Sequence, residues 1–215
     1  MSTNDSWNDK NTSGSAYKYS LFELSEKLAS KLSPKRLEHS HAVAYTAAAI
    51  AMKDGVEDVL PFVYAGLLHD CAKYMWGDEF IVFCESHGIE IDEDEKKLTS
   101  VLHGKVGAYL ARTEYGIEDE DILNAITHHT DGRPGMSYLE KVIHIADHIE
   151  PMRSFDMEPP LSEIRRLAFE NIDKAIYLMD KAIIDYLSGV GKIITKQSYE
   201  TVRYFEELLS GREKN

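Results

Sequence analysis

Residues 65–73 read AGLLHDCAK, which places His69 and Asp70 directly after an apolar run. A buried histidine or aspartate destabilises a fold unless it is paired or coordinated. Residues of the same chemistry recur along the chain in apolar helical surroundings: His39, His103, His129 and Asp147. Imidazoles and carboxylates suit iron, manganese or zinc, and the lack of thiolates at these positions disfavours a structural zinc site. The sequence therefore indicates a metal site assembled from distant segments.

Helical periodicity separates neighbouring candidates. His129 follows apolar residues three, four and seven positions earlier, so we expect it to point into the core. His128 follows polar residues at similar spacing, so we expect it to face solvent as a substrate contact rather than a ligand. Asp147 shares its face with Ile143 and Ala146 and is expected to point inward. A second stripe on the same helix is expected to be a solvated face: Glu140, His144 and His148.

Helix signals repeat along the whole chain, and strand signals are nearly absent. N-cap patterns at Ser33-Pro34 and Ser137 mark two helix starts. The sequence predicts an all-α fold, a single helical-bundle domain over residues 18–215 after a disordered tail over 1–17, with a solvated loop at 90–97. The expected helices are one through Leu21, Leu24 and Leu28, then 34–53, 59–74, 78–87, one from Thr99 to before Gly116, 118–130 and 138–150, with two or three more ending near Leu209.

The charge balance limits the partners. Among 215 residues, 24 are Lys or Arg and 37 are Asp or Glu, a net charge of −13. This balance argues against binding a nucleic-acid polymer, which needs basic surfaces, but permits a small phosphorylated substrate. The longest weakly polar run, residues 42–52, is too short to span a membrane, and no signal peptide is visible. Two cysteines form no disulfide framework, so we expect a cytoplasmic protein with free thiols.

The order of these ligand-type residues resembles the HD-domain superfamily of metal-dependent phosphohydrolases. Finer motifs resemble its YqeK-type branch, which cleaves diadenosine tetraphosphate symmetrically. These motifs are RLEH at 36–39, LLHDCAK at 67–73, VGA at 106–108, HTDGR at 129–133, and IADHIEP at 145–151 with Arg153. Two departures concern the pocket wall: Gly104-Lys105 follows His103 where Ala-Pro is more frequent, and His148 replaces an aromatic residue.

The resemblance implies a two-metal centre that hydrolyses diadenosine tetraphosphate at its central anhydride, giving two ADP. One metal would be held by His39, His69, Asp70 and Asp147. The other would be held by Asp70, His103 and His129, with Asp70 bridging the two. Iron is favoured and manganese is the alternative. The metals would supply the attacking hydroxide and neutralise phosphate oxygens. The resemblance also implies a homodimer.

A polyphosphate approaching an acidic protein needs local cations. Lys73 lies one helical turn beyond Asp70, and Arg133 follows His129 in a Gly/Pro turn that suits a bidentate phosphate clamp. We therefore expect Asp70, Lys73 and Arg133 to act in catalysis. Lys105, His128 and Thr130 are further candidates for substrate binding, and Arg36 and Asp131 are weaker ones.

Other functions remain open at this point. The same metal centre would serve a nucleotidase or a phosphodiesterase acting on mononucleotides or cyclic dinucleotides. A non-catalytic nucleotide sensor would usually have lost some ligands, whereas all six are present here. A di-iron oxygenase is a further reading. The GVGK stretch at 189–192 lacks the earlier glycine of a phosphate-binding loop, with Tyr186 in its place, so we expect it to end a helix.

Overall fold

The computed structural model describes residues 17–212, and every regular element in this part of the chain is helical. The all-α prediction is therefore confirmed. The predicted tail lies outside the described residues except for Tyr17, whose ring stacks on that of Tyr64 at a centroid distance of 3.7 Å. No helix within residues 17–212 combines the length and hydropathy of a membrane-spanning segment. The first helices are α1 (Leu21–Ala29), α2 (Pro34–Lys53), α3 (Leu60–Leu68), α4 (Asp78–His87) and α5 (Glu93–Lys97).

The chain continues through a short 3₁₀ turn, η1 (Thr99–Leu102), into α6 (His103–Thr113). Helices α7 (Glu120–His128) and α8 (Tyr138–Ile149) follow. Three helices form the C-terminal part, as expected: α9 (Leu161–Glu170), α10 (Ile172–Gly189) and α11 (Lys196–Arg212). Helix α10 ends at Gly189, which confirms that the GVGK stretch terminates a helix.

Helix starts follow the capping signals of the sequence. The Ser33 hydroxyl accepts a hydrogen bond from the backbone N–H of Arg36, and Pro34 occupies the first turn of α2. Ser137 and Glu140 form a reciprocal capping box that opens α8. Gly88 closes α4 with a φ of 68°, a left-handed conformation that glycine adopts without steric cost. Local chemistry therefore sets these boundaries.

Two predictions of local structure were wrong, one missed helix and one helix end. The loop expected at 90–97 contains α5, which is capped by Asp92 and Glu95 in a reciprocal box. The helix expected over 59–74 ends at Leu68, and residues 69–74 form successive turns. The backbone N–H of Lys73, for example, donates to the carbonyl of Asp70.

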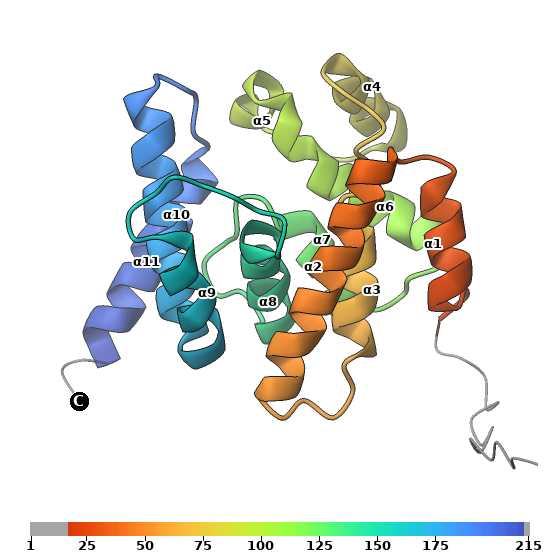
Figure 1. The fold of residues 1–215 in the computed structure, drawn as a ribbon. Helices are drawn as coiled ribbons and strands as arrows, with labels where there is room; N and C mark the ends of the chain where they lie inside the picture. Colours follow the sequence, from red (N-terminus) through yellow and green to blue (C-terminus); the bar gives the residue numbers. More distant parts are fainter. Residues whose placement is uncertain (1–16, 213–215) are drawn as a thin grey trace, which may run out of the picture.

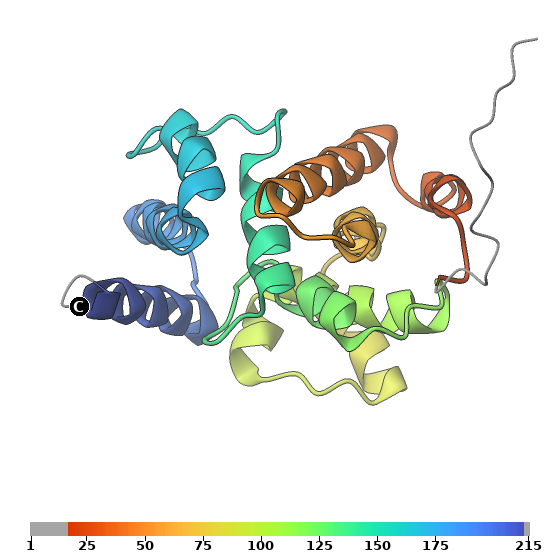
Figure 2. The same cartoon turned by 90° about the horizontal axis from the view of Figure 1, so that it is seen from below.

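Helix α8 lies at the centre of the molecule. In Figure 1 it stands between α2 on one side and α9 and α10 on the other. Figure 2 shows the same arrangement from below, with α2 and α3 to the right of α8 and α9, α10 and α11 to its left. Helices α2, α3, α7 and α10 all pack against α8. A side chain on α8 can therefore meet residues from both parts of the chain.

Two glycines allow close helix packing next to the ligand-type residues. A Cβ atom on Gly66 would lie 2.6 Å from the Cα of Ala44, so α3 approaches α2 more closely than any other residue would permit. A Cβ atom on Gly104 would collide with the backbone carbonyl of Thr127, at the end of α7. The departure from the family pattern at Gly104 thus coincides with a backbone contact that has no room for a side chain.

Candidate metal centre

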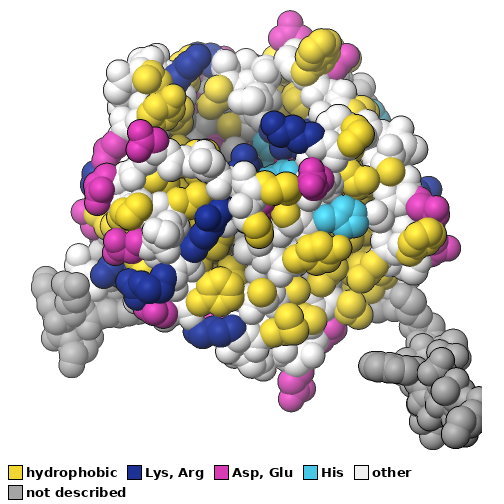
Figure 3. Space-filling model, viewed as in Figure 1, with side chains coloured by type: hydrophobic (Ala, Val, Ile, Leu, Met, Phe, Trp, Pro, Cys, Tyr) yellow, Lys and Arg dark blue, Asp and Glu magenta, His cyan; other side chains and the backbone are white. Residues whose placement is uncertain are grey.

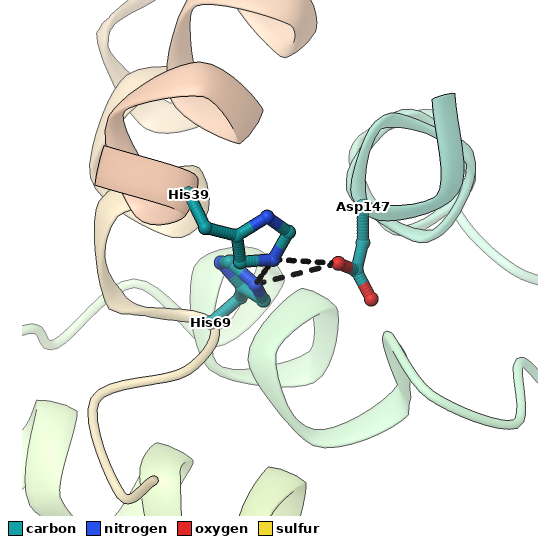
Figure 4. Close-up of side chains that lie close together, drawn as sticks. All are labelled: His39, His69 and Asp147. Atoms are coloured by element: carbon teal, nitrogen blue, oxygen red, sulfur yellow. Dashed lines mark hydrogen bonds and ion pairs between the residues drawn. The ribbon is translucent and has the colours of Figure 1, made fainter. Parts of the chain in front are cut away.

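The structure brings the six predicted ligands together. His39 comes from α2, His69 and Asp70 from the turn after α3, His103 from the first residue of α6, His129 from the end of α7, and Asp147 from α8. All four histidines and Asp70 are buried, and the Asp147 side chain is 13% exposed. Figure 4 shows His39, His69 and Asp147 pointing toward one another from separate elements. Five segments of the chain thus converge on one buried polar cluster.

Asp70 lies between two pairs of histidines. Its Oδ2 atom is 3.5 Å from Nε2 of His69 and 3.8 Å from Nε2 of His39. Its Oδ1 atom is 3.3 Å from Nε2 of His103 and 3.7 Å from Nε2 of His129. Each carboxylate oxygen therefore faces a different pair, which is the arrangement that a bridging carboxylate requires.

The pair next to Asp147 is tightly arranged. Nε2 of His39 lies 2.9 Å from Oδ1 of Asp147 and 3.3 Å from Nε2 of His69. Nε2 of His69 lies 3.8 Å from the same carboxylate oxygen. Dashed lines in Figure 4 mark these contacts. The two Nε2 atoms and the Asp147 oxygen are close enough together to ligate one metal ion.

All four imidazole rings present the same nitrogen to the centre, because each Nδ1 is engaged elsewhere. Nδ1–H of His69 donates to the carbonyl of Gly66 (2.6 Å), and Nδ1–H of His129 donates to that of Ile126 (2.7 Å). Nδ1 of His103 contacts the carbonyl of Ser100. Nδ1–H of His39 donates to the Glu150 carboxylate (3.1 Å). These outer hydrogen bonds fix the tautomer and leave Nε2 as the ligating atom.

The electrostatics favour a cation at this point. Burial opposes ionisation of Asp70 and Asp147, but the adjacent histidines hold the pKa of both carboxyl groups well below the usual range. Burial, together with the neighbouring His103 and His69, holds the pKa of His129 well below its ordinary value. The cluster therefore combines two carboxylates with a neutral imidazole.

The donor set fits metal ions. Nε2 of His103 and Nε2 of His129 are only 2.8 Å apart. Both Nδ1 atoms already contact backbone carbonyls, so the two Nε2 atoms face each other and the Asp70 carboxylate. Imidazole with carboxylate is a donor set suited to iron, manganese or zinc. The described residues contain two such groups of three, one with Asp147 and one with Asp70.

Arginines surround the carboxylates, and sequence reasoning gave them too little weight. Nη1 of Arg36 lies 2.5 Å from Oδ2 of Asp70. Nη2 of Arg153 lies 2.5 Å from Oδ1 of Asp147, and its Nε donates to the Asp147 carbonyl. Glu150, which orients His39, was likewise absent from the predicted site. Its position one turn after Asp147 in a helix that carries a ligand was the signal available for it.

The predicted basic residues differ in their surroundings. Lys73 is half-buried, and burial lowers the pKa of its ammonium group although Asp70 acts in the opposite direction. Arg133 is engaged by Glu140 in a bidentate pair, Nε to Oε1 at 2.6 Å and Nη2 to Oε2 at 2.9 Å. Nζ of Lys105 contacts Glu95 at 2.7 Å. Two of the three expected phosphate-binding cations thus already have carboxylate partners.

Thr130 and His128 lie on either side of His129 in the sequence, but their side chains have different surroundings. The Thr130 hydroxyl lies 3.2 Å from Nε2 of His103 and 3.2 Å from Nε2 of His129, so it belongs to the centre. His128 is half-buried rather than solvated, and it lines a polar cavity of about 300 Å³ together with Lys105 and Asp131. The periodicity argument correctly directs His129, and not His128, toward the cluster.

The expectation of a solvated stripe on α8 was wrong. Glu140 and His144 are each 1% exposed, and His148 is half-buried. Glu140 is neutralised by Arg133, and Nε2–H of His144 donates to Asp180 of α10 at 2.9 Å. The stripe faces the C-terminal helices, which cover α8 on the side that a lone amphipathic helix would expose to water.

The chain and its fold resemble known proteins. A family model described as HD domain matches residues 36–152, a range that contains all six ligand-type residues. The chain belongs to the HD-domain family. The structure of this HD domain superposes on a crystal structure from Clostridium acetobutylicum, described as a predicted HD superfamily hydrolase involved in NAD metabolism. The TM-score is 0.83 with 37% sequence identity, covering 88% of this chain and 98% of the other.

Three curated relatives bear the same enzyme name. The HD-domain chain is 34% identical over 183 residues to a symmetrical bis(5'-nucleosyl)-tetraphosphatase of Bacillus subtilis, covering 84% of this chain and 93% of the relative. It is 36% identical over 179 residues to a protein of the same name from Staphylococcus aureus, covering 81% and 89%. The similarity therefore extends well beyond the residues around the metal centre.

Proposed function

We propose that this HD domain is a metal-dependent hydrolase that cleaves diadenosine tetraphosphate at its central anhydride and releases two ADP. The observation that carries the proposal is the position of Asp70, whose two oxygens face two separate histidine pairs. Relatives that share 34% and 36% identity over most of this chain bear the name of that enzyme. The activity assigned to them supplies the substrate, and the cluster supplies a site with the required chemistry.

The six ligand-type residues would hold two metal ions, with Asp70 shared between them. When bound, these ions lower the pKa of a water molecule and neutralise negative charge on phosphate oxygens. Iron is the proposed metal and manganese the alternative, because imidazoles with a shared carboxylate suit both. Elemental analysis of protein purified without added metal tests the identity and the number of ions.

The surrounding side chains would bind and orient the polyphosphate. The Thr130 hydroxyl, beside His103 and His129, would donate to a phosphate oxygen at one end of the centre. Arg153 and Arg36, beside the two aspartates, would hold phosphate oxygens at the other. Lys73 would add positive charge from the turn that carries Asp70. Arg133 and Lys105 would contribute from the periphery, from positions where Glu140 and Glu95 also hold them.

Assembly and location complete the proposal. We propose a homodimer and a cytoplasmic location, the latter because both cysteines are buried and unpaired. Light scattering coupled to gel filtration tests the first, and fractionation of cells tests the second.

The deciding experiment incubates the iron- or manganese-loaded protein with diadenosine tetraphosphate and separates the products by anion exchange. ADP as the sole nucleotide product supports the proposal. AMP together with ATP would show that the enzyme hydrolyses diadenosine tetraphosphate asymmetrically. No turnover by protein with confirmed metal content would contradict the proposal and favour a mononucleotide or a cyclic dinucleotide as substrate.

A further inference from the structure

Two cavities share His148, which follows the ligand-type residue Asp147 on α8. The first has a volume of about 430 Å³ and the second about 570 Å³. His148, Ile183 and Leu187 line both cavities, so the wall between them is built from α8 and α10. Nδ1–H of His148 donates to the carbonyl of His144 at 2.9 Å, which fixes the ring in this wall.

The first cavity adjoins one half of the metal centre. Thr130 lines it, and the Thr130 hydroxyl lies 3.2 Å from Nε2 of both His103 and His129. Thr130 therefore connects this cavity to the pair of histidines that faces Oδ1 of Asp70.

The second cavity adjoins the other half. Arg153 lines it, and Nη2 of Arg153 lies 2.5 Å from Oδ1 of Asp147 and 3.4 Å from Nε2 of His39. Arg153 therefore connects this cavity to Asp147 and His39, on the side of the centre that Oδ2 of Asp70 faces. The two cavities approach the same centre from its two ends.

Both cavities have the chemistry that a nucleobase requires, which is an apolar slot with a few polar groups. The first is walled by Ile184 and Ile194, and its polar lining includes Ser100 and Lys192. The second offers aromatic faces from Phe155 and Tyr186, which are 43% and 67% exposed. Stacking of a base on an aromatic ring is favourable for any base. Figure 3 shows a recess in the upper part of this face, with hydrophobic side chains inside and basic and histidine side chains at its edge.

We propose that each cavity holds one nucleoside of the symmetrical substrate, so that the polyphosphate crosses the metal centre between Thr130 and Arg153. This inference rests on the proposed function, because only a dinucleoside substrate needs two such sites. Each nucleoside would be placed on its own side of Asp70, and the central anhydride would then lie over the ions. The positions of the two cavities would therefore determine that the central anhydride bond is the one hydrolysed.

A third cavity, of about 300 Å³, suits this role less well. Its two lysines are each paired with a carboxylate, Lys105 with Glu95 at 2.7 Å and Lys196 with Glu200 at 3.2 Å. Asp92 and Asp94 also line it, and their carboxylates would repel the phosphates attached to a nucleoside. The two cavities that share His148 are therefore the pair assigned to the substrate.

The test counts binding sites with the product ADP, by isothermal titration calorimetry of the metal-loaded protein. Ala182 lines only the second cavity and Ile184 only the first, and both are half-buried on α10. We expect two ADP per wild-type chain, and one per chain in each of Ala182→Trp and Ile184→Trp. Asp185→Trp, at an exposed position on the same helix, is the matched control and keeps two.

One ADP per wild-type chain would overturn the inference, as would two ADP per chain in both cavity-filling variants. The wild-type count decides the matter even if a tryptophan variant fails to fold. Kinetics give a second measurement, since adenosine tetraphosphate, which lacks one nucleoside, should show at least a 10-fold higher KM than diadenosine tetraphosphate at similar kcat. Equal KM values would contradict two nucleoside sites. Failure of the proposed function is seen separately, as two bound ADP without cleavage of the dinucleotide.

Discussion

Buried histidines occur in two different settings around α8: His144, which pairs with Asp180, and the four ligand-type histidines near Asp147. His144 uses both ring nitrogens to donate to oxygen: Nδ1–H to the carbonyl of His129 at 2.7 Å and Nε2–H to Asp180 at 2.9 Å. A ring with two donated protons carries a positive charge, which Asp180 neutralises. His144 and Asp180, here called the structural pair, therefore need no further partner.

The histidines of the candidate metal centre share their inner partners. Nδ1 of each ring has an oxygen partner of its own, whereas the Nε2 atoms point at one another, at two aspartates and at the Thr130 hydroxyl. The Nε2 atoms of His103 and His129 are 2.8 Å apart. His144 therefore has two separate oxygen partners, whereas four Nε2 atoms converge on the same few groups, and this convergence is what a metal ion requires.

The largest expected effect comes from removing the shared carboxylate. Asp70→Ala should lose both metal ions and lower turnover of diadenosine tetraphosphate on the order of 10³-fold or more, because each histidine pair loses its common oxygen. Metal content by mass spectrometry and product formation by anion exchange measure the two losses together. Asp180→Asn is the control, since it removes a buried aspartate from the structural pair and should leave metal content intact. Full turnover in Asp70→Ala would place the chemistry elsewhere.

A smaller effect is expected from the outer carboxylate that orients His39. Glu150→Gln keeps the shape of the side chain but weakens its hydrogen bond to Nδ1–H of His39. We expect metal affinity to fall by about 10- to 100-fold, as measured by competition with a chelator. Glu163→Gln, an exposed glutamate on α9, is the matched control. Unchanged affinity in Glu150→Gln would mean that His39 is oriented by packing alone.

The structural pair should affect stability rather than metal binding. Burial opposes a charge on His144, but Asp180 outweighs it and raises the pKa of His144 to about 9. A raised folded-state pKa stabilises the protein fully below about pH 6.5, and the contribution is lost as pH rises through about 9. Asp180→Asn should therefore cost about 3 kcal/mol at pH 6 and much less above pH 9.

Thermal unfolding at fixed metal occupancy, recorded from pH 6 to pH 10, measures this difference. At pH 6 the variant should lose on the order of 10 °C in Tm. A loss of the same size at pH 6 and pH 10 would show that the charge on His144 is not what stabilises the pair.

The smallest effect is expected at His148, which neighbours a ligand without joining the centre. His148→Phe should retain both metal ions and the Tm of the wild type within a few degrees, because its described hydrogen bond is a single one to the His144 carbonyl. KM for diadenosine tetraphosphate should change by less than about 10-fold, since a ring of similar size remains in the wall between the cavities. Loss of a metal ion in His148→Phe would show that His148 helps to hold the metal.

Much of the local structure could be predicted because its causes are local. The caps at Ser33 and Ser137 and the glycine after α4 are chemical signals within one turn of chain, and the helices begin and end there. The missed helix α5 carried the same kind of signal, since Asp92 and Glu95 have the spacing of a capping box. That error came from giving the acidity of the segment more weight than its cap.

The errors on α8 had a different cause. Glu140 and His144 alternate with an apolar face in the manner of a solvated stripe, yet each is 1% exposed. The residues that neutralise them, Arg133 and Asp180, lie 7 and 36 positions away along the chain. Periodicity describes one helix at a time, so it cannot show that α10 covers the polar side of α8.

The sequence by itself determined most of the helices, the inward direction of His129 and Asp147, and the set of residue types that suits a metal centre. These follow from the spacing of apolar residues and from the chemistry of single side chains. The tertiary structure decided which nitrogens converge on one point, how Asp70 divides its two oxygens, and where the two cavities lie relative to the centre. These depend on distances between segments brought together by packing around α8, and such distances are set by the whole fold.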